Sequence, residues 1–368
     1  MFEKFRVCHL TSAHPRFDTR ILVKECASLA KAGFDTHLIV ADGKGEENRG
    51  KVKIHDVGKK QGRFNRILNS SRAVFRKALE VDARIYHLHD PELMPYGLKL
   101  LKRGKIVIFD AHEDLPVQIL SKHYLNGYFA KFLSRIAVVY ENYACSKMSA
   151  IVTATPFIRE KFLKINENTI DINNFPILEE IKNEVSWSNK SNSAVYIGGI
   201  TKIRGIREIV KSLKFTKQAS LNLAGSFIEK DIETEVKGYA EWSKVNEYGH
   251  LDRESVSDLL LQSKVGLVTL YPQQNYLDSL PVKMFEYMNA GIPIIASDFP
   301  YWKSIIEDCK CGVTVNPLVP KEIGEAINFI LGDAHKAEQL GINGKNAVRA
   351  KYNWSIESSK LVNLYLSF

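Results

Sequence analysis

Short apolar runs alternate with longer amphipathic stretches along the whole chain. In the first half, the runs FRVCHL, THLIVA, IYHLH, KIVIFDA and AIVTAT predict strands. Between them, RILVKECASLAKAG, ELMPYGLKLLKRG and the stretch near residues 126–147 show helical periodicity. Strands that alternate with helices indicate a parallel sheet covered on both faces.

The second half repeats this pattern, with strands predicted at AVYIGG, SLNLAGS, VNEYGH, VGLVTLY, IPIIAS and GVTVNP. Between the halves, a polar Ser/Asn-rich run around Pro176 is typical of a linker. The fold class is therefore predicted as α/β, with two doubly wound domains at residues 1–175 and 176–350. We expect the two domains to face each other across a ligand-binding cleft at the carboxyl ends of their strands.

A final helix is predicted within residues 351–368. Its apolar positions are Ile356, Leu361, Leu364 and Leu366. This face packs either back across the domain junction or onto one domain as an ordinary terminal helix.

Composition narrows the class of protein. A chain of 368 residues with 45% apolar and 25% charged residues is an ordinary globular protein, long enough for two cores.

No apolar run is long enough to span a bilayer, and MFEKFRVCHLTS enters a strand directly, so we expect no signal peptide. Five cysteines without a paired metal motif predict reduced thiols and a cytoplasmic location. The net charge of +9 favours an anionic partner: nucleic acid, a membrane surface or a phosphorylated substrate.

The stretch NYLDSLPVKMFEYMNAGIPIIASD carries the most chemical information. It predicts a helix capped by Ser279, with Pro281 in its first turn and Gly291 at its end, followed by a buried strand. The open amides of a helix N-terminus near Ser279 and Leu280 are suited to a diphosphate.

Two acids flank this predicted phosphate site. Asp278 lies at the start of the helix and Glu286 lies inside it, so the pair is placed to bind hydroxyl groups at the two ends of a nucleotide sugar. Lys283, one turn before Glu286, supplies positive charge for the diphosphate. The alternative is that Lys283 forms a surface ion pair, which is common and weak.

A glycine-rich turn opens the second domain in YIGGITKIRGIREIV. Gly198 and Gly199 follow a strand, and Arg204 and Arg207 lie close enough in sequence to bind a phosphate. The spacing is not GxGxxG, so a dinucleotide fingerprint is absent. Turns of this kind also occur without a ligand.

Three polar clusters follow predicted strands of the first domain. They are His14, Arg16, Asp18 and Arg20 in SAHPRFDTR; His87, His89, Asp90 and Glu92 in HLHDPE; and Asp110, His112, Glu113 and Asp114 in DAHEDLP. Residues at strand carboxyl ends point toward the ligand cleft of such a fold, although histidines there are often structural. The spacing within HLHDPE is too short for one conventional zinc site and no HExxH occurs, so we expect no metal. The absence of GxSxG disfavours a serine hydrolase.

Residues 59–81 form a basic amphipathic segment. Its apolar positions are Phe64, Ile67, Leu68, Phe75, Ala78 and Leu79, and its basic ones include Arg63, Arg66 and Arg72. Such a helix suits an anionic bilayer surface, and the alternative is a core-facing helix with a solvated basic face. A second basic-aromatic stretch is KHYLNGYFAKFLSRIAVVY.

With these motifs in hand, the chain resembles the GT-B retaining glycosyltransferases of family four, which build bacterial polysaccharides. The resemblance covers nearly the whole length and is strongest over 194–205 and 265–298. The family signature is two glutamates separated by seven residues, represented here by Asp278 and Glu286. It implies that Glu286 holds the ribose of the donor nucleotide and that Asp278, one methylene shorter, holds the transferred sugar.

The resemblance also implies roles for residues outside the signature. Arg204 matches the family's diphosphate-binding cation, while Gly199 stands where most members have another. The stretch HLDRESVSDLL, preceded by Gly249 with His250 at its start, resembles the region that cradles the base. In the first domain His112 matches the cleft histidine that contacts the donor sugar. SAHPRFDTR replaces the usual Gly-Gly acceptor loop, which makes its charged and polar residues acceptor-side candidates: His14, Asp18 and Arg20, together with Glu113 and Asp114.

The function implied is a retaining, metal-independent hexosyltransferase without a cofactor. It would move a sugar from a nucleotide donor, UDP by default, to a lipid-linked or polysaccharide acceptor in O-antigen or capsule synthesis. It would be cytoplasmic and peripheral on the inner face of the cell membrane.

Two other functions remain open: a nucleotide-sugar epimerase or hydrolase of the same fold, and a non-catalytic glycan-binding protein. Nucleic acid is disfavoured as a partner, because the acid pair would repel phosphates and no base-stacking platform is evident.

Overall fold

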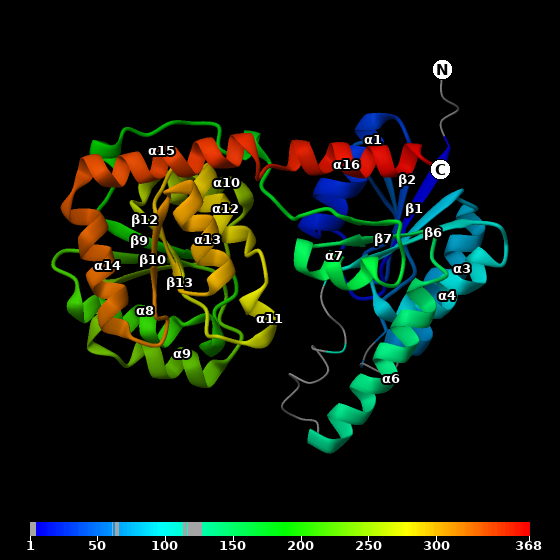
Figure 1. The fold of residues 1–368 in the computed structure, drawn as a ribbon, viewed down its shortest axis with the longest axis horizontal. Coiled ribbons are helices and arrows are strands. Elements are labelled where there is room, and N and C mark those ends of the chain that lie inside the picture. The colour runs from blue at the N-terminus through cyan, green and yellow to red at the C-terminus, as the bar shows by residue number, and fades with distance from the viewer. Residues whose placement is uncertain (1–4, 61, 63–65, 113–115, 117–126) are drawn as a thin grey trace. The chain divides into compact units, whose positions relative to one another are not determined.

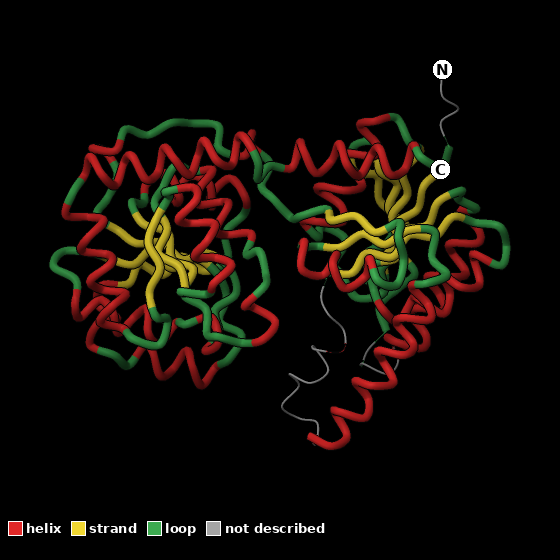
Figure 2. Tube along the Cα trace, in the orientation of Figure 1, coloured by secondary structure: helices red, strands yellow, loops and turns green. Residues whose placement is uncertain are grey.

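The chain forms two compact units. The structure is a computed structural model that describes residues 5–60, 62, 66–112, 116 and 127–368. One unit comprises Met1–Asn174 with Ser355–Phe368, and the other comprises Phe175–Trp354 (Figure 1). Each unit has its own sheet with helices on both faces (Figure 2). The prediction of two α/β domains is therefore confirmed.

The first unit contains an eight-stranded sheet in the order β3-β4-β2-β1-β5-β6-β7-β8. Its strands are β1 (Arg6–Leu10), β2 (Asp35–Val40), β3 (Glu47–Arg49), β4 (Val52–Asp56), β5 (Ile85–Leu88), β6 (Ile106–Ala111), β7 (Ala150–Thr153) and β8 (Thr169–Asp171). All neighbours are parallel except β3 and β4. The outer strands β3 and β8 were not predicted, because three residues each carry no clear apolar pattern. β4 was also missed, although Val52 and Ile54 alternate in it as buried apolar residues.

Helices connect these strands. They are η1 (Thr19–Cys26), α1 (Ala27–Ala32), η2 (Arg66–Ser70), α3 (Ser71–Val81), η3 (Pro91–Leu93), α4 (Met94–Leu101), α6 (Gly127–Cys145), α7 (Pro156–Leu163) and α16 (Trp354–Leu366). The helix predicted over residues 20–33 begins as a π-helical segment, in which Val23 N donates to Asp18 O over 3.4 Å, and then continues as α1.

The apolar face of α3 lies in the core of the first unit. Val74, Ala78 and Val81 are buried there, with Phe75 and Leu79 packed against them. Residues 71–81 therefore form a core-facing helix with a solvated basic face, and the prediction that this helix lies on a membrane is wrong for that part. Arg63 lies outside the described residues.

The second unit contains a six-stranded parallel sheet in the order β11-β10-β9-β12-β13-β14. Its strands are β9 (Ser193–Ile197), β10 (Ser220–Ala224), β11 (Val245–Gly249), β12 (Val265–Val268), β13 (Ile294–Ser297) and β14 (Gly312–Val315), each at a predicted position. Its α-helices are α8 (Ile206–Ser212), α9 (Lys230–Lys237), α10 (Arg253–Gln262), α11 (Gln274–Leu277), α12 (Val282–Asn289), α13 (Pro300–Cys309), α14 (Pro320–Gly332) and α15 (Ala334–Ala350). Short 3₁₀ turns are η4 (Leu178–Glu180), η5 (Trp187–Asn189), η6 (Lys202–Arg204), η7 (Leu213–Phe215) and η8 (Ala240–Lys244).

The C-terminal helix α16 belongs to the first unit from Ser355 onward. Glu357 Oε2 accepts a hydrogen bond from Asn173 N at 2.8 Å, and Tyr365 is fully buried. Of the apolar face expected from the sequence, Leu361 and Leu364 are buried, whereas Ile356 and Leu366 are exposed. The chain thus returns to the first unit after completing the second.

Two further expectations concern cysteines and membrane spans. All five cysteines are free. Within the described parts of the chain, no helix combines the length and apolar character needed to cross a bilayer.

Candidate functional site

In the second unit, the loop after β9 brings two cations together. Gly198 has φ +107°, and a Cβ on it would lie 3.6 Å from Lys283 Nζ. A Cβ on Gly199 would lie 2.9 Å from Arg204 Nη1, which donates a hydrogen bond of 3.0 Å to the Gly199 carbonyl. Gly199 therefore leaves space that Arg204 occupies, whereas Gly198 is favoured beside Lys283 by its positive φ. Lys283, which the sequence selected from a different motif, thus lies beside the glycine turn and Arg204.

Lys283 has an unusual environment. Its Nζ is buried, lies 3.7 Å from the ring centroid of Tyr196 and has no hydrogen-bond partner among the described residues. Burial and the nearby charge of Arg204 lower the pKa of Lys283 well below its usual value, and Glu286 opposes this shift. A desolvated ammonium beside a second cation is unfavourable, and an anion bound between them would relieve that cost.

The N-terminus of α12 is open, although not in the way the sequence predicted. Pro281 occupies the N-cap position and no side chain caps the helix. The prediction that Ser279 caps α12 is wrong, because α12 begins at Val282 and its N-cap position falls on Pro281, while the Ser279 hydroxyl donates to Tyr276 O over 2.9 Å. The buried Trp302 holds this loop by donating from Nε1 to the Ser279 carbonyl over 2.7 Å. The prediction that the helix ends at Gly291, with φ +66°, is confirmed.

The two signature acids lie on either side of this helix start. Asp278 directly follows α11 and precedes α12, and Glu286 lies on α12 one turn after Lys283; both are partly exposed. Tyr287 fixes α12 against the sheet, since its hydroxyl accepts a hydrogen bond of 3.1 Å from Ile197 N at the end of β9. The helix that carries Lys283 and Glu286 is thus bonded to the end of the strand that Gly198 directly follows.

Gly249 and His250 lie at the end of β11, on the same edge of the sheet. Gly249 O accepts a hydrogen bond of 2.7 Å from Gly225 N, and His250 is exposed. Arg207, by contrast, is paired with Glu235 and is not the second cation at the glycine turn. Lys283 is the second cation beside the glycine turn.

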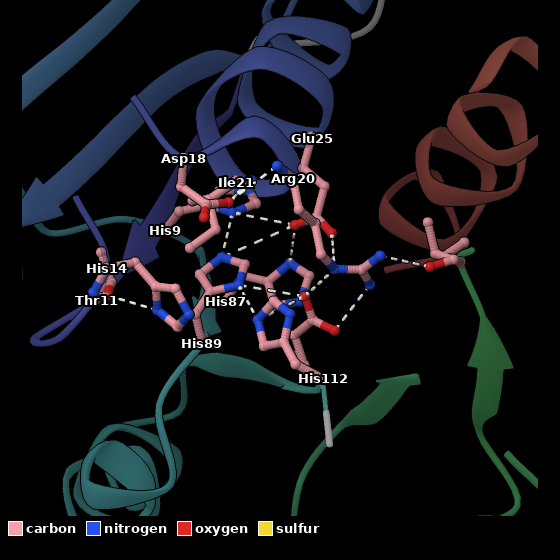
Figure 3. Close-up of polar contacts among 12 residues, drawn as sticks. His9, Thr11, His14, Asp18, Arg20, Ile21, Glu25, His87, His89 and His112 are labelled. Carbon is pink, nitrogen blue, oxygen red and sulfur yellow. Dashed lines mark hydrogen bonds and ion pairs between the residues drawn. The ribbon is translucent and has the colours of Figure 1, made fainter. Parts of the chain in front are cut away.

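In the first unit, His14 and His112 approach each other with ring centroids 5.3 Å apart (Figure 3). His14 Nδ1 lies 3.0 Å from Asp90 Oδ1 and 3.2 Å from Thr11 Oγ1. Burial alone would lower the pKa of His14, but the hydrogen bond and charge of Asp90 outweigh it and raise the pKa. His14 therefore takes up a proton more readily than a free imidazole.

His112 is the opposite case. Its Nε2 lies 3.3 Å from Asp110 Oδ2 and 3.3 Å from His89 Nδ1. Burial lowers the pKa of His112 to about 3, although Asp110 acts in the other direction. Near neutral pH this side chain is an uncharged imidazole, beside a protonatable partner in His14.

Asp18 and Arg20, expected on the acceptor side, form hydrogen bonds within the first unit. Asp18 Oδ1 caps η1 by accepting from Arg20 N and Ile21 N, both at 2.9 Å. Arg20 is buried, binds Asp110 through Nε and Nη2 at 2.9 Å each, and donates from Nη1 to Ile172 O at 2.6 Å. Arg20 therefore positions Asp110. Glu113 and Asp114 lie outside the described residues.

Comparisons with known proteins identify the family. The family model "Glycosyl transferases group 1" matches residues 178–347, and "Glycosyltransferase Family 4" matches residues 19–172. An alpha-D-kanosaminyltransferase from Streptomyces kanamyceticus is 20% identical over 275 residues, which cover 68% of this chain and 70% of that protein.

Solved structures agree on the fold. Sucrose-phosphate synthase from Thermosynechococcus elongatus superposes with a TM-score of 0.79 at 18% identity, covering 99% of this chain and 98% of that one. HepE from Anabaena, in complex with UDP and glucose, superposes with a TM-score of 0.74 at 12% identity, covering 99% and 100%. Since the two family models together match residues 19–172 and 178–347, which hold every strand of the two sheets except β1, the chain belongs to the family-four glycosyltransferases and has the GT-B fold.

Proposed function

We propose that this protein is a retaining glycosyltransferase that takes a sugar from a UDP donor and transfers it to a lipid-linked or polysaccharide acceptor of a surface glycan such as O-antigen or capsule. The main support for a nucleotide-sugar donor is Lys283 Nζ, which is buried beside Gly198 and has no hydrogen-bond partner among the described residues. An unpaired ammonium next to Arg204 and the open N-terminus of α12 is complementary to a diphosphate. HepE, a relative in fold, has been crystallised with UDP and glucose, which favours uridine as the base.

The other residues take roles around this anion site. Glu286 would bind the ribose hydroxyls and Asp278 the hydroxyls of the transferred sugar, as in the family signature. Gly249 and His250 would border the base. In the first unit, His112 is an uncharged imidazole able to exchange hydrogen bonds with a sugar hydroxyl, and His14 is the acceptor-side candidate that stays partly exposed.

Leaving-group stabilisation explains how these residues would accelerate transfer. As the anomeric carbon–oxygen bond breaks, negative charge develops on the diphosphate. Arg204, Lys283 and the first amides of α12 would stabilise that charge without a metal ion or cofactor. The departing phosphate oxygen then accepts the proton of the acceptor hydroxyl as the new bond forms on the same face, which retains the anomeric configuration.

Donor binding and turnover test the proposal together. Among a panel of nucleotide sugars, UDP-sugars are expected to raise the melting temperature by mass action, and UDP alone to do so as well. Release of UDP should then require an acceptor. Turnover of the sugar without acceptor would instead indicate an epimerase or hydrolase. Binding of glycan but of no nucleotide would indicate a non-catalytic glycan-binding protein.

A surface feature of the first unit supports a membrane-bound acceptor. Along α6, an apolar stripe formed by Tyr128, Phe132, Ile136, Val139 and Tyr143 is exposed, with Tyr128 at 88% and Val139 at 70%. Lys131 and Arg135 are exposed on the same helix. In Figure 1 the N-terminal part of α6 projects beyond the other helices of its unit. Apolar and aromatic side chains next to basic ones suit an anionic bilayer surface.

We therefore expect Phe132→Glu combined with Val139→Glu to weaken binding to anionic vesicles by about 10–100-fold, because two exposed apolar side chains would lose their burial in lipid. Cosedimentation with phosphatidylglycerol vesicles measures this. Phe329→Glu, at an exposed aromatic position on α14, is the matched control. Unchanged vesicle binding by the double variant would contradict a membrane role for α6. The proposed location is the cytoplasmic face of the cell membrane.

A further inference from the structure

Behind the His14–His112 pair lies a group of four fully buried side chains, here called the inner histidine cluster: His9, Glu25, His87 and His89 (Figure 3). His9 comes from β1, Glu25 from η1, and His87 and His89 from β5 and the residue directly after it. One candidate ligand atom from each residue lies within 4.8 Å of the others. The proposed transfer reaction uses none of these four side chains.

The spacing within the cluster fits a small cation. His9 Nδ1 lies 2.8 Å from His89 Nε2, and Glu25 Oε2 lies 3.7 Å from His9 Nδ1 and 3.8 Å from His89 Nε2. His87 adds a third imidazole, with Nδ1 at 4.0 Å from Glu25 Oε2. Ligand atoms at about 2.0–2.1 Å from a tetrahedral zinc ion are separated by about 3.3 Å, which lies inside this range.

The outer hydrogen bonds also match those of metal-binding histidines. The other nitrogen of His89, Nδ1, lies 3.2 Å from Asp110 Oδ2, and the other nitrogen of His9, Nε2, lies 3.2 Å from the Tyr365 hydroxyl. A ligating imidazole typically donates its second N–H to a carboxylate or another oxygen in this way, which fixes the ring. Asp110 is in turn held by Arg20.

Two buried carboxyl groups, Glu25 and Asp110, share one guanidinium beside the cluster. Arg20 lies 3.1 Å from Glu25 Oε1 but already binds Asp110 with two hydrogen bonds, so one guanidinium faces two buried carboxylates. Three buried atoms lack a hydrogen-bond partner in the part of the chain that the structure describes: both carboxyl oxygens of Glu25 and Nε2 of His87.

We propose that His9, Glu25, His87 and His89 form a buried structural site for a divalent cation of borderline softness, for which Zn²⁺ is the best match. Three imidazoles and one carboxylate form a nitrogen-rich closed set suited to zinc rather than to magnesium or calcium. The site departs from the sequence-based expectation of no metal. The ion would join β1, β5 and η1 behind Asp110 and His112 and would have no contact with the reacting groups.

Metal content tests the proposal directly. Untagged protein, purified without chelating resin and dialysed against Zn²⁺, is expected to hold about one zinc per chain by mass spectrometry. Protein refolded with Co²⁺ should show the intense visible d–d bands of a tetrahedral nitrogen and oxygen site, and a strong chelator should lower the melting temperature. Glu25→Gln and His89→Gln are expected to reduce bound metal at least tenfold.

Two controls define the outcome. His55→Gln disrupts another imidazole pair of the same unit, His37–His55 at 2.8 Å, and should keep the metal. His112→Gln should also keep it, since His112 belongs to the neighbouring group with Asp110. Because Glu25→Gln can itself impair folding, the Co²⁺ spectrum of the unaltered chain is an independent measurement. Absence of zinc and of these bands after loading would overturn the proposal, and so would metal lost in His112→Gln but retained in Glu25→Gln.

Discussion

Lys283→Met is expected to lower the transfer rate by about 10²–10³-fold, the usual cost of removing one group that stabilises developing charge. The same variant should melt about 2–4 °C higher, because it removes a desolvated ammonium that has no hydrogen-bond partner among the described residues and leaves an apolar chain over the Tyr196 ring. Initial rates with a UDP-sugar and thermal melts of the empty protein measure the two effects. Replacing a lysine with a purely structural role would not combine a lower transfer rate with a higher melting temperature.

The charge of Lys283 also predicts a pH dependence. Its pKa is lowered in the empty site, so the ammonium loses its proton more readily than a free lysine. A bound diphosphate favours the charged form and raises the pKa again, so donor binding takes up a proton and weakens as pH rises through the pKa of the empty site. Calorimetry in buffers of different ionisation enthalpy measures that uptake, and Lys283→Met should abolish it.

Lys303→Met, at an exposed position on α13, is the control for both experiments. If Lys283→Met transfers sugar at the rate of the unaltered protein, the phosphate site is not where we place it.

Glu286→Gln is expected to weaken the binding of UDP itself by about 10–100-fold, because a carboxylate that accepts hydrogen bonds from ribose hydroxyls contributes about 1.5–3 kcal/mol. The loss should be present with UDP alone, before any sugar is attached. Isothermal titration with UDP measures it. Glu286→Ala should likewise reduce transfer from every nucleotide sugar that is a substrate.

Asp278→Asn distinguishes the role of Asp278 from that of Glu286. It should leave the affinity for UDP within about threefold while lowering transfer by about 10–100-fold, because Asp278 is assigned to the transferred sugar. Glu325→Gln on the exposed face of α14 is the surface control. Equal loss of UDP affinity in Asp278→Asn and Glu286→Gln would contradict this division of roles, and wild-type transfer by Glu286→Ala would overturn the site.

Much of the fold could be read from local patterns. The long buried strands of both sheets and the helices between them follow from runs of apolar residues and their period, which are local properties. The outer strand β3, with the sequence ENR, was missed because it pairs through backbone hydrogen bonds without an apolar pattern. Ser279 was misassigned as a cap because α12 begins at Val282, which puts the N-cap position at Pro281, two residues after Ser279.

By itself the sequence determined the class of fold, the order of elements and which residue types could meet a nucleotide sugar, since glycine turns, helix starts and spaced acids are encoded within short segments. Tertiary structure decided which of these act together. It placed Lys283 over Tyr196 and beside Gly198, and it paired the buried Arg20 with Asp110. It also brought four buried side chains together from separate segments: His9, Glu25, His87 and His89. Burial and unbalanced charge arise only when distant residues pack, and those two quantities distinguish a binding group from a structural one.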